Sequence, residues 1–330
     1  MGNFQFKKGI KGLSLCLLAC LLINTRVFAF DRKTSFALSH YIMAVMYDDL
    51  GDIDKAVWEY KQALKADSNS SVIHLNLASS YIKKNEIEKA IEELNLTVKL
   101  DPEAVEPHAI LALLYSSGNK LDLATGEYEI ALKNAIKLEP KNIDIYKALG
   151  TLYFQKKNLK AAEDAYRLIL NLSPDDSEAH FYLANIYAEL KERKKVEGEL
   201  KKALELKPDY PEALNYLGYL YVEDNKNLDK AETMIKKALE IDPHNGAYVD
   251  SLGWLYFKQA KFKEAIKELE KATSLLEDPV IHEHLGDAYF KISDIEKAKL
   301  NWQESLKLDP QQDRVREKIE RVTSKPVTSN

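Results

Sequence analysis

The sequence predicts an all-α protein that is built from one helical hairpin repeated eight times. Three observations support this fold class. The chain of 330 residues is 45% hydrophobic and 30% charged, with only 12 glycines and 10 prolines, which is typical of a folded, helix-rich protein and of neither a disordered chain nor an integral membrane protein. One tyrosine recurs at a nearly constant interval, and a proline closes most of the intervals. Such a repeat overrides the number of domains that length alone suggests.

Eight tyrosines set the period, with steps of 34, 34, 38, 34, 34, 35 and 33 residues: Tyr47, Tyr81, Tyr115, Tyr153, Tyr187, Tyr221, Tyr256 and Tyr289. Three residues before each lies a small residue: Ala44, Ala78, Ala112, Gly150, Ala184, Gly218, Gly253 and Gly286. A leucine precedes the small residue, except in the first repeat, which has Met43. Nine or ten residues after the tyrosine comes Ala56, Ala90, Ala124, Ala162, Val196, Ala231, Ala265 or Ala298. Six repeats end in proline, at Pro102, Pro140, Pro174, Pro208, Pro243 and Pro310.

The physical roles of these places fit a stacked helical hairpin. The leucine, the small residue and the tyrosine lie on one face of a helix, because positions three and four apart are neighbours. A small residue lets two helix axes approach to about 8 Å. Proline cannot donate an interior hydrogen bond and disfavours helix at the residue before it, so it separates one hairpin from the next. Each hairpin buries its apolar face only by stacking on its neighbours.

This pattern resembles the tetratricopeptide repeat, a helical hairpin of 34 residues with small residues at fixed places. The resemblance implies a right-handed superhelical solenoid of eight units, at residues 37–70, 71–104, 105–142, 143–176, 177–210, 211–245, 246–278 and 279–312. Before it lies a short N-terminal segment, residues 30–36. After it we expect a capping helix, residues 313–323, that lays Val315, Ile319 and Val322 over the eighth unit, and then a disordered tail, residues 324–330.

Two units are longer than 34 residues. The third carries four extra residues between Ala131 and Pro140. Four residues are about one helical turn, so we expect them to lengthen the second helix of that unit without rotating its faces. The sixth carries one extra residue in the stretch VEDNKNLDKA, which we expect in the turn between its two helices.

The first 29 residues predict a cleaved secretory signal. Lys7, Lys8 and Lys11 form a basic segment, the apolar run LSLCLLACLLI follows, and Val27-Phe28-Ala29 ends in the small residue that a signal peptidase requires. The run is too short to span a bilayer. Two alternatives stay open: a helix that is not cleaved, and lipidation of Cys20 in the lipobox-like LLAC, which would give a membrane-associated protein. We expect an exported protein, periplasmic or envelope-associated in a bacterium.

Export also bears on the chemistry of the mature chain. Cleavage after Ala29 removes Cys16 and Cys20, the only two cysteines, and with them disulfide, thiolate-zinc and cysteine-nucleophile chemistry. It also removes four basic residues and no acid, which lowers the formal net charge from −5 to −9. So acidic a chain argues against nucleic acid as a partner.

Five histidines share the fourth place of their units: His40, His74, His108, His180 and His282. Equivalent helices of neighbouring units lie about 10 Å apart, which is too far for ligands that must each approach a zinc ion to about 2.1 Å. His282 and His284 are two residues apart, so on a helix they point about 200° apart. We therefore expect packing roles and no metal site.

The sequence predicts no catalytic residue, cofactor or small-molecule substrate. It contains no nucleophile elbow, phosphate-binding glycine loop or zinc-protease helix motif. Acid pairs such as Asp175 and Asp176 fall where helices begin, and a contact with the helix dipole explains them. What remains is binding.

In the family, the second, fifth, ninth, twelfth and thirteenth places of each first helix line the concave groove that holds a partner. Carried over, these places predict a C-terminal groove lined by Phe154, Phe181, Asn185, Asn215, Tyr219, Asp250, Trp254, Phe257, Glu283, Asp287 and Phe290. The N-terminal groove is more aliphatic, with Tyr41, Val45, Leu75 and Leu113, and acids repeat at the second place in Asp144, Glu178 and Glu212. The lysine and asparagine clamp of some cytosolic members is absent, because only Lys147 is a lysine at the fifth place and Thr151 follows it at the ninth.

We expect a non-enzymatic protein-protein interaction scaffold in the bacterial envelope, serving assembly or export. The stretches YVDSLGWLYF and DPVIHEHLGDAYF resemble the last repeats of exported bacterial members of the family. Aromatic groups beside Asp250, Glu283 and Asp287 predict a partner segment with apolar and basic residues, unless Trp254 and Phe257 pack between neighbouring units instead. Two alternatives are a lipid-anchored, pilotin-like assembly factor for a pilus or polysaccharide export machine, and an envelope hydrolase or its regulatory subunit.

Overall fold

The structure is a computed structural model that describes residues 32–323, and every regular element in this range is an α-helix. The predicted signal peptide and the predicted disordered tail lie outside the described residues. The helices are α2 (Arg32–Asp49), α3 (Ile53–Ala66), α4 (Ser71–Lys83), α5 (Ile87–Leu100), α6 (Val105–Ser117), α7 (Leu121–Leu138), α8 (Ile143–Gln155), α9 (Leu159–Leu172), α10 (Ser177–Glu189), α11 (Arg193–Leu206), α12 (Pro211–Glu223), α13 (Leu228–Ile241), α14 (Gly246–Lys258), α15 (Phe262–Leu275), α16 (Pro279–Lys291), α17 (Ile295–Leu308) and α18 (Asp313–Thr323).

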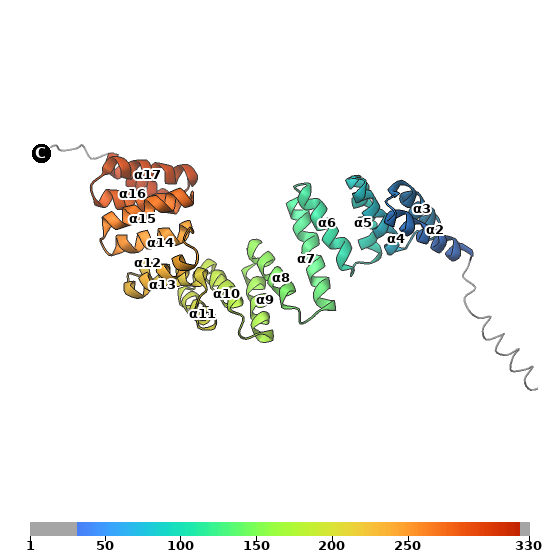
Figure 1. Cartoon of the computed structure of the whole chain (residues 1–330), viewed down its shortest axis with the longest axis horizontal. Helices are drawn as coiled ribbons and strands as arrows, with labels where there is room; N and C mark the ends of the chain where they lie inside the picture. The colour runs from blue at the N-terminus through green and yellow to red at the C-terminus, as the bar shows by residue number, and fades with distance from the viewer. Residues whose placement is uncertain (1–31, 324–330) are drawn as a thin grey trace, which may run out of the picture. The chain divides into compact units, whose positions relative to one another are not determined.

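The described residues divide between two units, residues 32–140 and 141–323. The first holds three hairpins, α2 with α3, α4 with α5 and α6 with α7; the second holds five, from α8 with α9 to α16 with α17, and then α18. Within each unit successive hairpins lie side by side (Figure 1). The predicted fold class, an all-α stack of repeated hairpins closed by a C-terminal helix, is confirmed.

The turn inside each hairpin has one geometry, and the recurring tyrosine is part of it. The carbonyl oxygen of Tyr81 accepts a hydrogen bond from the amide of Glu86, 2.9 Å away, across Asn85 with φ 58°. The carbonyls of the other seven recurring tyrosines accept the same bond from the residue five places on. This bond is typical of a helix C-terminus whose next residue is left-handed. A left-handed residue lies in every such turn: Gly51, Asn85, Asn119, Lys157, Lys191, Asn225, Ala260 and Ser293.

The small residue of each first helix lies against the second helix of the same hairpin. A Cβ atom added to Gly150 would come within 2.8 Å of the Tyr166 ring, and one added to Gly218 within 2.8 Å of Ile235 Cγ1. Real side chains do not approach so closely, so glycine sets the distance between the two helices at these places. The predicted role of the small residue is confirmed.

The two longer units behave as predicted. Helix α7 has 18 residues where α5 has 14, so the four extra residues of the third unit do lengthen its second helix. In the sixth unit the extra residue lies between α12 and α13, where Asn227 is left-handed in addition to Asn225. None of the helices in residues 32–323 is long and apolar enough to cross a membrane.

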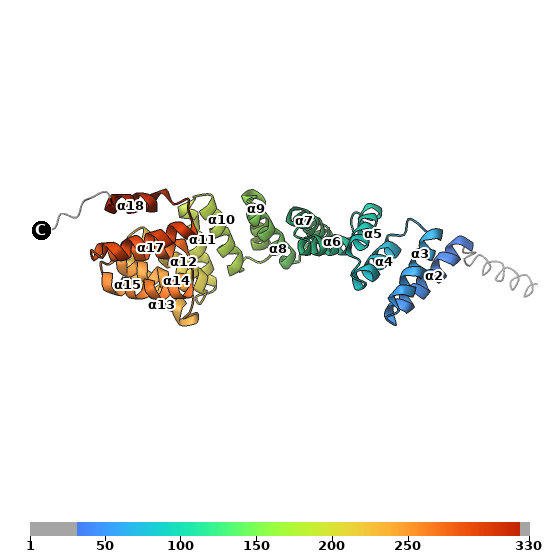
Figure 2. The same ribbon diagram turned by 90° about the horizontal axis from the view of Figure 1, so that it is seen from above.

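Helix α18 closes the C-terminal unit as expected. It lies beside α17 (Figure 2). Val315 is almost fully buried, and Ile319 and Val322 pack with it against Leu285, Tyr289 and Trp302. The stripe of three apolar side chains on an otherwise polar helix covers the apolar face that the eighth hairpin would leave bare.

Candidate partner-binding surface

The histidines of the fourth place each bond to a group on the second helix of their own hairpin. His74, His108 and His180 lie with Nδ1 2.6 Å from a carboxylate oxygen of the glutamate 19 residues on, which is Glu93, Glu127 or Glu199. His40 bonds to Glu59 in the same way, and His282 Nδ1 lies 3.4 Å from Asn301 Oδ1.

The other ring nitrogen of two of these histidines reaches the preceding loop. Nε2 of His74 lies 3.2 Å from the Ser68 carbonyl oxygen, and Nε2 of His108 lies 3.3 Å from that of Pro102. These rings therefore tie two helices and a loop together, as buried polar groups must find partners. The glutamate partners were missed from the sequence, although their constant spacing from the histidines is visible there.

Side chains at the fifth place of one unit bond to the first helix of the next unit. Lys147 Nζ donates to Glu178 Oε2 at 2.5 Å and lies 3.0 Å from Asp176 Oδ2. Burial opposes the charge on Lys147, but its bonds to the two acids outweigh burial and raise the pKa of the ammonium group. Asp250 Oδ1 lies 2.9 Å from His284 Nδ1 in the following unit. Part of the predicted groove surface is therefore contact between neighbouring helices.

Trp254 is the centre of an aromatic stack and is only 6% exposed. Its ring lies 4.5 Å from that of Phe257 at an interplanar angle of 8°, and 4.0 Å from that of His284 at 11°. Its Nε1 donates to Glu223 Oε1 at 2.7 Å. Of the two interpretations left open for Trp254, the structure therefore favours packing between neighbouring units over a free groove surface, because the indole stacks on His284 and its one donor already has a partner in Glu223.

The acids of the C-terminal groove are compensated by α18. Glu283, which is buried, accepts from Arg314 Nη2 at 2.7 Å and from Lys318 Nζ at 2.6 Å. Lys318 Nζ also lies 2.6 Å from Asp287 Oδ1. Burial opposes ionisation of Glu283, yet the bonds from Lys318 and Arg314 outweigh it and hold the pKa of the carboxyl below its ordinary value.

Three acids on which the expectation of a basic partner rested are therefore not free: Asp250, Glu283 and Asp287. Sequence reasoning missed Arg314 and Lys318 as partners of Glu283 and Asp287, and it missed His284 as the partner of Asp250. The sequence feature that could have predicted the two cations is the spacing of Arg314 and Lys318, because two cations four residues apart lie on one face of the capping helix. Arg314 follows Glu283 by 31 residues, as Glu178 follows Lys147, so both pairs join the fifth place of one unit to the second place of the next.

The other predicted groove residues are more accessible. Phe154, Phe181, Asn185, Asn215, Tyr219, Phe257 and Asp287 are half-buried, and Phe290 is exposed. The Phe181 ring lies 5.1 Å from that of Tyr210. Burial raises the pKa of the Tyr219 phenol, so it stays neutral.

Phe257 and Phe290 belong to a hollow of about 200 Å³ between α14, α16, α17 and α18. Trp302 and Val322 complete its apolar lining. Its charged lining residues are Asp287, Lys291, Lys318 and Arg321. Lys318 is held by Asp287 and Glu283, whereas Lys291 and Arg321 are exposed and form no ion pair within residues 32–323. The hollow is therefore lined by aromatic side chains, and the exposed cations Lys291 and Arg321 lie at its edge.

A second hollow, of about 650 Å³, is acidic. Its lining includes Asp175, Asp176, Glu178 and Glu212. Two of the predicted second-place acids, Glu178 and Glu212, meet here, but Lys147 already neutralises part of their charge. The third, Asp144, is exposed and does not line the hollow.

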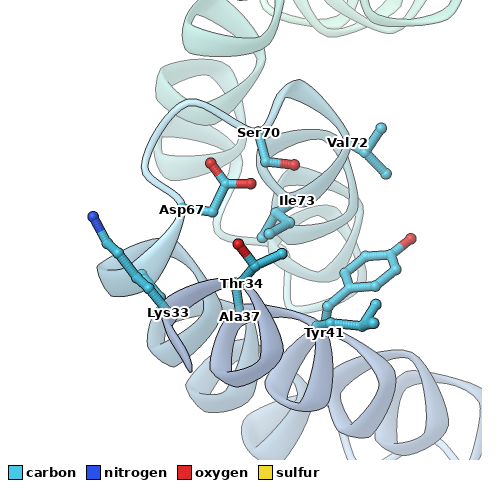
Figure 3. A pocket seen from close by; sticks show the side chains of 10 residues that line it. Lys33, Thr34, Ala37, Tyr41, Asp67, Ser70, Val72 and Ile73 are labelled. Atoms are coloured by element: carbon cyan, nitrogen blue, oxygen red, sulfur yellow. The ribbon is translucent and has the colours of Figure 1, made fainter. Parts of the chain in front are cut away.

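A third hollow, of about 510 Å³, lies in the N-terminal unit between α2 and α4. Thr34, Asp67 and Ser70 gather on one side of it, and Tyr41 and Val72 lie on the other (Figure 3). Of the aliphatic groove predicted in this unit, only Tyr41 lines the hollow. Val45 and Leu75 are half-buried and pack against the core, and Leu113 is exposed.

Sequence comparison matches models described as tetratricopeptide repeat to residues 49–114, 131–186, 199–233 and 250–278, which together are more than half of the chain. Comparison with curated proteins gives no match.

Two solved structures share the fold at low identity. A tetratricopeptide repeat protein of Parabacteroides merdae is 18% identical, with a TM-score of 0.55 over 77% of this chain and 99% of its own. The APC/C hetero-tetramer Cut9-Hcn1 is 17% identical, with a TM-score of 0.57 over 82% of this chain and 52% of the matched chain, so the present chain spans about half of that one.

Proposed function

Because the chain belongs to the tetratricopeptide repeat family, we propose that it is a non-enzymatic scaffold that holds an apolar segment of a partner protein in the hollow under α18. The fold itself supports a protein-protein interaction scaffold. This site is chosen because Phe290 is exposed beside Phe257 and Trp302. The three aromatic residues line a hollow that is large enough for a side chain of the partner. Buried aromatic contacts of this kind supply much of the affinity at protein interfaces.

The charges around the hollow suggest the polar part of the partner. Arg321 and Lys291 are exposed cations without an ion pair in the described chain, whereas Glu283 and Asp287 are held by α18. An acidic residue next to the apolar anchor would therefore be oriented by the rim, because complementary charges set orientation and association rate. A basic partner segment, as expected from the sequence, would instead fit the acidic hollow at Glu212.

Replacing Phe257 and Phe290 together with alanine is expected to weaken binding of a partner captured by cross-linking by about 2 kcal/mol or more, as for interface hot spots. Calorimetric titration of the purified pair measures the effect. Phe290 is exposed and Phe257 is half-buried, so circular dichroism should show unchanged helical content.

Leu300→Ala is the matched control, since Leu300 is exposed on α17 and does not line the hollow. Arg321→Glu should also weaken binding, and more strongly at low salt. Full affinity in the double alanine variant would show that the partner binds elsewhere. If Glu212→Lys weakens binding and Arg321→Glu has no effect, the partner binds at the acidic hollow instead.

We further propose that the scaffold acts in the bacterial envelope, in assembly or export. The support is the N-terminal sequence, with a basic segment, a short apolar run and a cleavage site at Val27-Phe28-Ala29. The pilotin-like alternative differs only in what happens at Cys20.

Mass spectrometry of the mature protein should find a chain that starts at Phe30. A chain that starts at a lipidated Cys20 would favour the anchored assembly factor, because one or more acyl chains place the protein on a membrane. Fractionation of the same cells provides the control. Full-length protein in the cytoplasm would contradict export.

A further inference from the structure

The charges of the C-terminal unit are divided between its two edges. The turn edge carries the turns inside the hairpins, at residues 155–161, 189–195, 223–230, 258–264 and 291–297. These segments hold 14 lysines and arginines and 8 acids. The loop edge carries the segments that lead into the first helices and into α18, at residues 141–145, 172–179, 206–213, 241–248, 275–281 and 308–315. These hold 3 lysines and arginines and 11 acids, so the unit is basic along one edge and acidic along the other.

Many cations of the turn edge are not compensated by the acids beside them. Four of its acids are paired with cations of the same edge: Glu189, Glu192, Glu223 and Asp224. Five exposed lysines form no ion pair within residues 32–323, and they come from three successive hairpins: Lys191, Lys194, Lys226, Lys230 and Lys263. Because successive hairpins lie side by side in this unit, these five free lysines form a row along the turn edge.

Exposed aliphatic side chains lie at two of these turns. Leu190 is 39% exposed and precedes Lys191, and Ile292 is 44% exposed and follows Lys291. Each is the first residue after the end of its helix, α10 or α16. A dissolved polyanion gives such a side chain no apolar surroundings. The headgroup region of a bilayer does so, while lysines beside it bind the lipid phosphates.

We propose that the turn edge of the C-terminal unit binds the surface of a membrane that contains anionic phospholipids. The five free lysines contact phosphates of the headgroups, and Leu190 and Ile292 enter the apolar boundary between headgroups and acyl chains. The same surface repels the acidic loop edge, so the division of charge sets which edge faces the membrane. None of the five free lysines lines the hollow under α18.

Reversing two lysines of the row tests the role of charge. Vesicles of phosphatidylglycerol and phosphatidylethanolamine should sediment more of the parent protein than vesicles of phosphatidylcholine, and added salt should reduce the difference. Lys194→Glu combined with Lys226→Glu should weaken binding to the anionic vesicles at least about 25-fold, because each cation near such a surface contributes about a factor of five. Both side chains are exposed, so circular dichroism should be unchanged.

Lys141→Glu combined with Lys271→Glu is the matched control. Both lysines are exposed and have no ion pair in the described chain, and the net charge changes by the same amount. Lys141 lies on the loop edge and Lys271 lies near the far end of α15 from its turn. This variant should bind nearly as well as the parent protein. An equal loss in the two charge variants would overturn the proposal, and so would a parent protein that anionic vesicles do not sediment at low salt.

Replacing the two aliphatic side chains separates a bilayer from a dissolved polyanion. Leu190→Ser combined with Ile292→Ser should weaken binding to the anionic vesicles about 10-fold. Leu206→Ser combined with Leu275→Ser, which changes similarly exposed side chains on the loop edge, should not. Equal binding of these two variants would overturn the membrane contact.

The tests keep the proposals of this protein separate. All variants carry the same N-terminus, so a lipid on Cys20 would add equally to each and leave the differences between them intact. Partner binding at the hollow under α18 is measured in solution without vesicles, so either proposal can fail alone.

Discussion

Gly286→Leu is expected to lower the free energy of unfolding by about 3 kcal/mol, at the upper end of the usual cost of overpacking a core. A Cβ atom at Gly286 would lie 2.4 Å from Cδ1 and 2.5 Å from Nε1 of Trp302. The indole cannot move aside easily, because Trp302 is buried against α18 and its Nε1 donates to Asp287 Oδ1 at 3.0 Å. Helices α16 and α17 must therefore separate.

Urea unfolding followed by circular dichroism measures this loss. Gly198→Ala is the matched control, since Gly198 also lies within a helix but nothing is within 4 Å of an added Cβ atom. That variant should be unchanged or more stable by about 0.5 to 1 kcal/mol, because alanine favours helix over glycine. Equal stability of Gly286→Leu and the parent protein would mean that the close helix contact is not required.

Deleting residues 313–330 is expected to destabilise the eighth hairpin by about 3 kcal/mol while leaving the N-terminal unit unchanged. Removing α18 uncovers the apolar face that Val315, Ile319 and Val322 protect, and burying side chains of this size contributes about 1.5 to 3 kcal/mol each when burial is complete. In a stack of repeats the loss stays near the end where it occurs. Amide hydrogen exchange should therefore lose protection first in α16 and α17.

Lys318→Met separates the ionic part of this contact from the apolar part. The variant keeps a long apolar side chain on α18 but leaves Glu283 and Asp287 without their shared cation. Glu283 keeps its bond from Arg314, but Asp287, which is half-buried, loses its ion pair. Loss of a cation from partly buried carboxylates costs more than loss of an exposed one, so the effect should exceed that of Lys307→Met, which removes an exposed pair with Glu304. For the deletion of residues 313–330, an equal loss of protection from hydrogen exchange along the whole chain would contradict a stack in which only neighbouring hairpins interact.

The sequence alone was enough to predict the register of the hairpins and the position of the capping helix. Each hairpin uses the same local chemistry, such as the tyrosine carbonyl that accepts the turn amide and the small residue against the second helix. These interactions join residues within one unit at a fixed spacing, so a repeating pattern of residue types reports them directly. The extra turn of α7 could be placed for the same reason, because four residues return a helix to the same face.

The accessible part of the candidate site was decided by the tertiary structure. Asp250, Trp254 and Glu283 occupy groove places of the family, yet they are buried by contacts with the next unit or with α18. Whether a side chain on a first helix is free depends on what the neighbouring unit carries at its own second and sixth places, such as Arg314 and Lys318 on α18. Burial and ion pairing are properties of two elements together, and a family position defined within one unit carries no information about its partner in the next.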